Sequence, residues 1–284
     1  MVGMKTQSKL ARLLKLLISV VFFCQFGFWN LIRRLMGNKA VGSSVVLYYH
    51  GVPSEERAQF ARQLDTVVRL AKPITTDVRF PLNTGEHYVA ITFDDGFESI
   101  LVNAIPELKK RRIPSTIFVP TQLLGQFPPW LTTAEDQDRN GKLMSVEQLQ
   151  RLPADLVTIG SHGKTHCLLP SLNEECAKRE LSESRTKLEE LLNRRITVFS
   201  FPFGALSQDL VGWCREAGYE RVFTSSPVIA FADPQEFETG RVWAEPTDWP
   251  LEFRLKILGA YRWLPWAIAL KRKVLSFKIR LWSV

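Results

Sequence analysis

The chain has 284 residues, 45% of them hydrophobic, and a formal net charge of +8. This length and composition suit one large α/β domain with tails, and the absence of any fixed-period repeat excludes a repeat array. The charge is concentrated at the ends: residues 1–40 carry +7 and residues 251–284 carry +7, so the body between them carries about −6. An acidic body excludes a nucleic-acid groove on the folded domain, whereas basic ends rich in Trp, Phe and Leu favour membrane lipid as a partner.

The cysteines give no sign of a paired-thiol site. The chain has four, namely Cys24, Cys167, Cys176 and Cys214, and no two of them form a CxxC pair. Neither a disulfide scaffold nor a thiolate zinc site is therefore predicted.

Residues 16–32 (LLISVVFFCQFGFWNLI) form an uncharged apolar run between basic flanks. As a helix, these 17 residues would reach roughly 26 Å, at the short end for a hydrocarbon core of about 30 Å. The run could therefore cross a bilayer or lie in its interface. A cleaved signal peptide is disfavoured because no small-x-small cleavage pattern follows, and a buried helical hairpin of the domain is the remaining alternative.

From residue 43 the chain alternates between apolar strands and amphipathic helices. We expect strands at residues 45–49, 88–93, 115–120, 156–160, 197–201, 221–224 and 241–243. We expect helices at residues 57–71, 97–111, 145–152, 173–194 and 207–217, and one or two surface helices after residue 251. The polar loop at residues 121–142 is expected to form a lid or substrate wall. About seven strand-helix units predict a parallel α/β barrel with its functional residues at the carboxyl ends of the strands.

The segment YVAITFDDG at residues 88–96 is the focus of the chain, because a buried strand ends there at two adjacent carboxylates. Asp94 and Asp95 repel each other when both are ionised, so this arrangement calls for a compensating cation, of which a divalent metal is the simplest. The alternative is a plain turn, since Asp-Gly is common turn chemistry.

Other polar groups follow other predicted strands. His50 follows the first strand, His162 and His166 follow LVTIGS, and Phe203 lies in a Pro-Phe-Gly turn after TVFSF. Three of the four histidines are thus expected at one end of the barrel. His162 and His166 are spaced to present two nitrogen ligands on one side, and a carboxylate beside them would complete a three-ligand site with open positions, which is typical of catalytic zinc.

The motifs ITFDDG, SHGKTH and FPFG, in this order and with YYHGV before them, resemble those of the polysaccharide deacetylase (NodB-homology) family, in the branch that opens with a YHxV strand. The resemblance covers residues 43–242. It implies a deformed (β/α)7 barrel with parallel strands. It also implies that Asp95, His162 and His166 bind a divalent metal, expected to be zinc.

The same resemblance assigns the catalytic roles. Asp94 is expected to be the general base, and the backbone N–H of Phe203 is expected to join the oxyanion site. His50 is expected to protonate the departing amine, because the equivalent histidine is thought to do so in this branch.

Two features depart from the family pattern. Residues 198–201 offer no arginine to contact Asp94, and no histidine follows His166. We therefore expect Asp94 to lack its usual arginine partner and the acid role to depend on His50 alone. His87 precedes a strand at the opposite end of the barrel and is given no functional role.

The predicted function is a metal-dependent hydrolase that removes N-acetyl groups from amino sugars of a surface polysaccharide or its lipid-linked precursor. The alternatives are a deacylase of another acyl group or a non-sugar amide, and a catalytically degenerate, membrane-attached glycan-binding protein. We expect residues 1–40 to be a membrane-associating segment, residues 43–250 the barrel and residues 251–284 basic amphipathic helices. The expected location is a bacterial inner membrane, with the cytoplasmic face favoured over the periplasmic one; the oligomeric state is left open.

Overall fold

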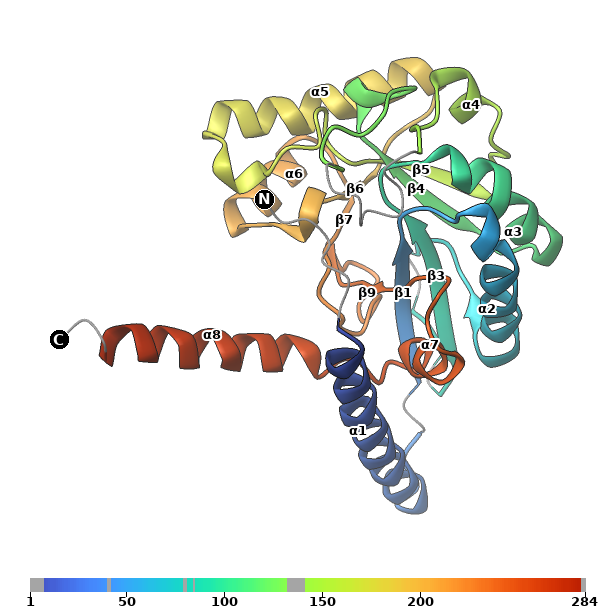
Figure 1. The fold of residues 1–284 in the computed structure, drawn as a ribbon, viewed down its shortest axis with the longest axis vertical. Helices are drawn as coiled ribbons and strands as arrows, with labels where there is room; N and C mark the ends of the chain where they lie inside the picture. Colours follow the sequence, from blue (N-terminus) through green and yellow to red (C-terminus); the bar gives the residue numbers. More distant parts are fainter. Residues whose placement is uncertain (1–7, 40–41, 79–80, 84, 132–140, 282–284) are drawn as a thin grey trace.

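The computed structural model describes residues 8–39, 42–78, 81–83, 85–131 and 141–281. Its centre is one parallel sheet in the order β8-β7-β6-β5-β4-β3-β1-β9, with β2 paired beside β3. The sheet curls on itself and helices cover its outside (Figure 1). The fold is therefore an α/β fold consistent with the predicted deformed (β/α)7 barrel.

The strands are short, and the seven predicted ones all form. They are β1 (Ser43–Tyr49), β2 (Lys72–Pro73), β3 (His87–Phe93), β4 (Ser115–Val119), β5 (Val157–Ser161), β6 (Val198–Ser200), β7 (Arg221–Phe223), β8 (Glu238–Thr239) and β9 (Val242–Trp243). The two-residue strands β2 and β8 were not predicted, because two residues show no periodicity.

The helices that cover the sheet lie close to their predicted positions. They are α2 (Arg57–Leu70), α3 (Ile105–Arg111), α4 (Val146–Gln150), α5 (Glu174–Leu192), α6 (Gln208–Glu216) and α7 (Pro250–Ile257), with α1 (Lys9–Leu35) and α8 (Leu264–Leu281) at the two ends. Shorter turns are η1 (Ser54–Glu56), the π-helical η2 (Ile100–Ala104), η3 (Thr121–Leu123), η4 (Leu169–Ser171) and η5 (Pro202–Gly204). The helix predicted at 97–111 is thus η2 followed by α3.

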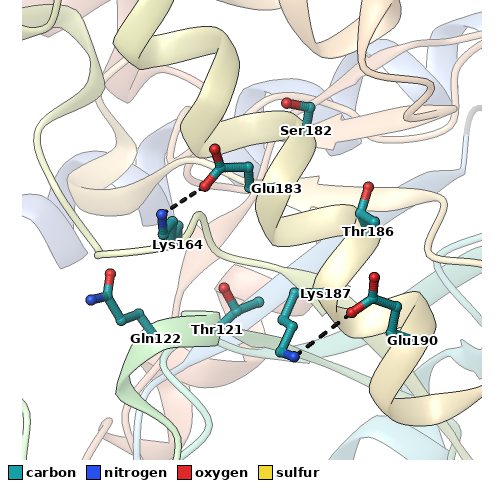
Figure 2. Close-up of a pocket in the computed structure, with 8 residues that line it drawn as sticks. All are labelled: Thr121, Gln122, Lys164, Ser182, Glu183, Thr186, Lys187 and Glu190. Atoms are coloured by element: carbon teal, nitrogen blue, oxygen red, sulfur yellow. Dashed lines mark hydrogen bonds and ion pairs between the residues drawn. The ribbon is translucent and has the colours of Figure 1, made fainter.

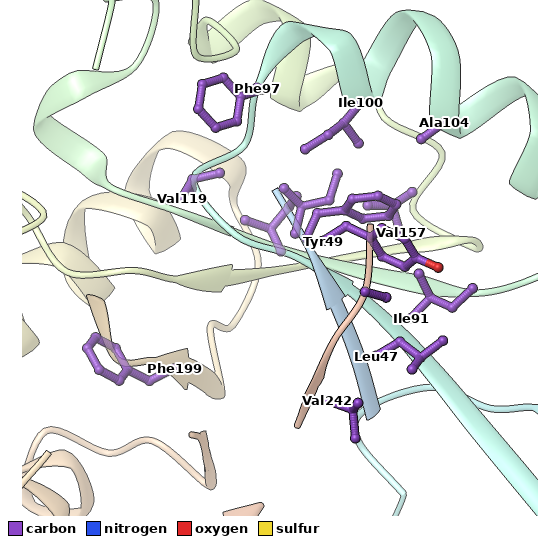
Figure 3. Close-up of a cluster of buried hydrophobic side chains, with 14 of the residues drawn as sticks. Leu47, Tyr49, Ile91, Phe97, Ile100, Ala104, Val119, Val157, Phe199 and Val242 are labelled. Carbon is purple, nitrogen blue, oxygen red and sulfur yellow. The ribbon is translucent and has the colours of Figure 1, made fainter. Parts of the chain in front are cut away.

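Side chains of the strands alternate between two apolar layers, as the pleat of a strand requires. Val45, Leu47 and Tyr49 of β1 belong to the large cluster between the sheet and the helices, part of which Figure 3 shows. Val46 belongs instead to the smaller cluster inside the barrel. Burial on both faces explains why these strands read as continuous apolar runs in the sequence.

One segment, residues 238–243, closes the barrel. Its first part, β8, pairs with β7, and its second part, β9, pairs with β1 through the register Leu47↔Val242. Gly240 and Arg241 lie at the junction between the two pairings. A Cβ on Gly240 would lie 2.2 Å from the carbonyl oxygen of Ser226, so the close approach of the two segments requires glycine here.

The helices near the two ends of the chain, α1, α7 and α8, differ in how they meet the barrel. α7 packs against α1, α2 and β1, and Phe253, Leu255 and Ile257 are buried there. Within the described residues, α1 is the one helix long and apolar enough to cross a bilayer. α8 extends away from the body of the molecule (Figure 1).

Candidate active site

Three potential metal ligands meet at the carboxyl ends of β3 and β5. Asp95 follows β3, while His162 and His166 follow β5, and their ligand atoms all lie within 4.8 Å of one another. Asp95 Oδ1 lies 3.1 Å from His166 Nε2 and 3.6 Å from His162 Nε2. All three residues are buried. The structure thus brings together the three residues that the sequence grouped.

The backbone at this site is locally unusual. Asp95 and His166 both adopt positive φ angles, 66° and 56°, a conformation that costs a non-glycine residue on the order of 1–2 kcal/mol. Gly96 also has a positive φ, and a Cβ there would lie 2.5 Å from Val119 Cγ1. Residues held in such conformations cluster at functional sites, where the surrounding fold over-determines them.

The hydrogen bonding around the triad fits a bound cation. His162 Nδ1 donates to the carbonyl oxygen of Ser200 at 2.7 Å, which leaves the lone pair of Nε2 available on the side of Asp95. Burial lowers the pKa of His162 to about 4, so the ring is neutral at pH 7. Asp95 Oδ1 and His166 Nδ1 are among the buried side-chain atoms of the described residues that have no hydrogen-bond partner. Two imidazoles and one carboxylate with open positions are a donor set that suits zinc.

The neighbouring carboxylate, Asp94, is held by an arginine. Arg241 Nη1 donates to Asp94 Oδ1 at 2.7 Å and Arg241 Nη2 donates to Asp94 Oδ2 at 2.8 Å. Arg241 also donates to Ser200 Oγ at 2.7 Å and to Thr92 Oγ1 at 3.1 Å. Burial by itself raises the pKa of Asp94, but the guanidinium outweighs it and the pKa lies below the usual value. Asp94 is therefore an ionised, oriented carboxylate.

Aromatic rings enclose this arginine. The guanidinium carbon of Arg241 lies 4.6 Å from the ring centroid of Tyr48 and 5.4 Å from that of Phe118. Only 1% of Arg241 is exposed. The rings exclude water and offer cation-π attraction, which strengthens the ion pair in this low-dielectric space.

His50 and Phe203 lie at the same end of the barrel. His50 follows β1, is half-buried, and packs edge-on against the ring of Tyr48 at 5.9 Å. Phe203 has a φ of 58° between Pro202 and Gly204, and its ring lies 4.7 Å from the ring of His166. His87 lies at the other end, where its Nδ1 is 2.7 Å from Ser43 Oγ.

The loop predicted as a lid or wall contributes one contact that the sequence did not indicate. Trp130 stacks on His166, with ring centroids 3.6 Å apart and an interplanar angle of 20°. His166 is thus flanked by Trp130 and Phe203. Residues 132–140 of the same loop lie outside the described part of the chain.

The model of the polysaccharide deacetylase family matches residues 82–222. That range contains both carboxylates, both histidines of the triad and the Pro-Phe-Gly turn described above. The chain belongs to the polysaccharide deacetylase family.

Individual members of the family agree with this assignment. IcaB from Ammonifex degensii is 27% identical, with a TM-score of 0.63 over 76% of this chain and 97% of that one. The deacetylase PplD of Streptococcus pyogenes, solved in complex with acetate, shares the fold at 19% identity, with a TM-score of 0.63 over 77% of this chain and 99% of that one. YxkH of Bacillus subtilis (strain 168), named as a candidate polysaccharide deacetylase, is 25% identical over 161 residues. These residues are 57% of this chain and 53% of YxkH, so the match spans about half the length of that relative.

In this polysaccharide deacetylase chain, the prediction that Asp94 lacks an arginine partner is wrong. Arg241 reaches the carboxylate from the junction between β8 and β9, about 40 residues after the motif in which an arginine was sought. In the sequence, the sign of this role is the position of Arg241 at the start of the last predicted strand, residues 241–243. That signal becomes readable only when the last strand is placed beside the first.

A groove lined by polar and charged side chains lies beside Lys164, which stands between His162 and His166 in the chain (Figure 2). It has a volume of about 570 Å³ and is lined by η3, Lys164 and one face of α5. Lys164 pairs with Glu183 at 2.6 Å, and Lys187 pairs with Glu190 at 3.7 Å. None of its lining residues belongs to the triad, so this groove adjoins the site without being the catalytic cleft.

Proposed function

We propose that this deacetylase-family hydrolase uses one divalent metal, zinc, to remove N-acetyl groups from amino sugars of a surface polysaccharide or its lipid-linked precursor. The observation that carries the proposal is the buried triad of Asp95, His162 and His166, whose ligand atoms converge and leave Asp95 Oδ1 without a hydrogen bond, beside an ionised Asp94. The match to the polysaccharide deacetylase family model supports the glycan class of substrate. Residues 43–250, with α7 covering them, form the catalytic unit in this proposal.

The three triad residues would hold the metal. When bound, it would act as a Lewis acid on the acetamide carbonyl and lower the pKa of a water molecule. Asp94 takes the proton from the attacking water, because Arg241 keeps this carboxylate ionised and fixed in orientation. The backbone N–H of Phe203, aimed by the positive-φ turn around it, donates to the oxyanion that develops on the carbonyl oxygen.

His50 completes the reaction as the general acid. The C–N bond of the acetamide breaks as His50 gives a proton to the nitrogen, since an amide nitrogen leaves poorly as an anion. The products are acetate and a free amino sugar. In support of this role, His50 follows β1 at the same end of the barrel at which Asp94 and Asp95 follow β3.

Metal content and turnover of two histidine variants test the proposal. His162→Ala should lose the single bound metal and the release of acetate from N-acetylglucosamine oligomers, while circular dichroism shows a folded barrel. His87→Ala is the matched control, because it removes a histidine that contacts Ser43 at the opposite end of the barrel. A His162→Ala protein with one full equivalent of metal by elemental analysis would place the metal elsewhere.

A further inference from the structure

The amino-terminal half of α1 is tied to the barrel by charged hydrogen bonds. Arg12 Nε donates to Glu252 Oε2 at 2.7 Å, and Arg12 Nη2 donates to the carbonyl oxygen of Thr247 at 3.0 Å. The same guanidinium lies 3.6 Å from Asp248 and 4.6 Å from the ring centroid of Trp249. All four partners lie in or just before α7, and both acidic side chains are buried.

The contacts continue along the helix toward its carboxyl end. Ser19 is fully buried and accepts a hydrogen bond from Trp263 Nε1 at 2.9 Å. Further on, the guanidinium of Arg262 lies 4.6 Å from the ring centroid of Phe26. From Arg12 to Phe26, over roughly 21 Å, the helix therefore follows α7 and the segments just before and after it. A helix that crossed a bilayer over residues 16–32 would have to break these contacts or draw the flank of the barrel into the hydrocarbon.

The outer side of α1 is apolar along its whole length. Seven residues there are each more than half exposed, at helical spacing: Leu10, Leu14, Leu17, Val21, Phe28, Leu31 and Leu35. Trp29 beside them is 62% exposed. We call these eight residues the outer stripe. The charged residues near its ends, including Arg33 and Arg34, are all basic, because residues 1–40 contain no acidic residue.

α8 presents a second surface of the same kind. Trp266 is 83% exposed and Leu270 is 64% exposed, and exposed Lys271 follows. The segment before α8 approaches the start of β1, since a Cβ on Gly259 would lie 3.4 Å from Ser43 Cβ. α1 ends shortly before the same strand begins. Both helices therefore extend from the amino ends of the strands, opposite to the triad, and Figure 1 shows them projecting beyond the barrel there.

We propose that α1 stays docked on the barrel and that its outer stripe, together with α8, attaches the protein to an anionic lipid surface from one side, without crossing the bilayer. Exposed Trp and Leu next to Lys and Arg, without acidic neighbours, suit the interface of an anionic bilayer. If a second copy of this chain covered the outer stripe instead, two helices whose charged residues are all basic would lie side by side, and charge repulsion opposes that arrangement. In this arrangement the active site opens away from the lipid.

Vesicle flotation of the full-length protein tests the lipid surface. The protein should float with vesicles of phosphatidylglycerol in phosphatidylcholine and float weakly with pure phosphatidylcholine. Arg33→Glu/Arg34→Glu should lower the partition coefficient at least about 30-fold, from roughly 1 kcal/mol for each basic residue. The matched charge control is Lys109→Glu/Lys110→Glu on α3, which should leave partitioning unchanged.

A second pair of variants tests the outer stripe. Phe28→Ser/Trp29→Ser should reduce flotation strongly, whereas Val102→Ser, an exposed apolar residue on η2, should not. Turnover without vesicles should be unchanged in each, which confirms folding. The proposal would be overturned if the full-length protein did not bind anionic vesicles. It would also be overturned if light scattering showed a dimer that Phe28→Ser/Trp29→Ser converts to a monomer.

Thiol labelling separates one-sided attachment from crossing. Ser8→Cys and Asn38→Cys, which flank α1, are each made in a chain with Cys24, Cys167 and Cys176 changed to Ala. In membranes prepared in one orientation, an impermeant maleimide should label both positions or neither. Labelling of one position in right-side-out vesicles and the other in inverted vesicles would mean that α1 crosses the bilayer, and would refute the proposal.

Discussion

Replacing Arg241 should damage both stability and turnover while sparing the metal. Arg241→Ala leaves Asp94 as a buried charge without its bidentate partner, and it also removes the hydrogen bonds to Ser200 and Thr92. Breaking a buried ion pair in this way costs about 3–5 kcal/mol. For a domain of this size, that loss corresponds to a fall in Tm of roughly 6–20 °C.

Turnover should fall independently of this loss of stability. Without the guanidinium, burial raises the pKa of Asp94 and the carboxylate is free to rotate, so most of the roughly 10²–10⁴-fold contribution of a general base is lost. Arg241→Lys keeps the charge but cannot supply two parallel N–H donors, and we expect it to recover stability better than kcat. Neither variant removes a triad residue, so elemental analysis should find one metal in each.

A double-mutant cycle with Asp94→Asn tests the reasoning directly. Because the two groups form one buried pair, the double variant should be clearly more stable than the sum of the two single losses predicts. The measurements are the free energies of unfolding from denaturant titration and the initial rates of acetate release. Additive losses, or an Arg241→Lys protein with the turnover of the parent, would show that Arg241 does not position Asp94.

Three further outcomes follow from the site. Asp94→Asn should keep one metal by elemental analysis yet lose at least about 100-fold in kcat, because a proton acceptor is removed and not a ligand; an equal loss of metal would assign Asp94 to the metal site instead. His50→Ala should slow acetamide hydrolysis more than hydrolysis of an acetate ester, because an alkoxide leaving group needs less protonation than an amine. Equal losses of rate on both substrates would show that the role of His50 is structural. Gly160→Ala should lower the Tm measured by differential scanning fluorimetry, because its Cβ would lie 2.5 Å from the ring of Phe118 inside the barrel; a parent-like Tm would show that the interior can yield.

Local patterns in the sequence predicted most of the strands and the grouping of the site residues. The apolar run of β3 ends at Phe93, directly before Asp94 and Asp95, in the structure as in the sequence, and His162 and His166 follow β5 as expected. Such features are readable because parallel strands buried on both faces are apolar throughout, and their carboxyl ends meet at one end of the barrel. The roles assigned to these residues remain predictions that the variants above test.

Other features depend on residues far apart in the chain. Trp130 stacks on His166 from a loop whose composition shows only that it is polar and long. The hydrogen bond between Arg12 and Glu252 joins the amino-terminal and carboxy-terminal segments, which the sequence analysis described as two separate basic ends. No periodicity or motif encodes such a contact, because each partner looks like an ordinary surface charge until the fold brings the two together.

By itself, the sequence determined the fold class, the family and the residues at the carboxyl ends of the strands, since each is written in a short, local pattern. Only the tertiary structure decided what holds Asp94 and how α1 lies. Arg241 meets Asp94 because β8 and β9 close the barrel between β7 and β1, so the pairing of the last strand with the first decides the contact. Similarly, the sequence of residues 16–32 is compatible with a membrane span or with a surface helix, and only the structure shows the polar contacts of α1 on which the proposed docking rests.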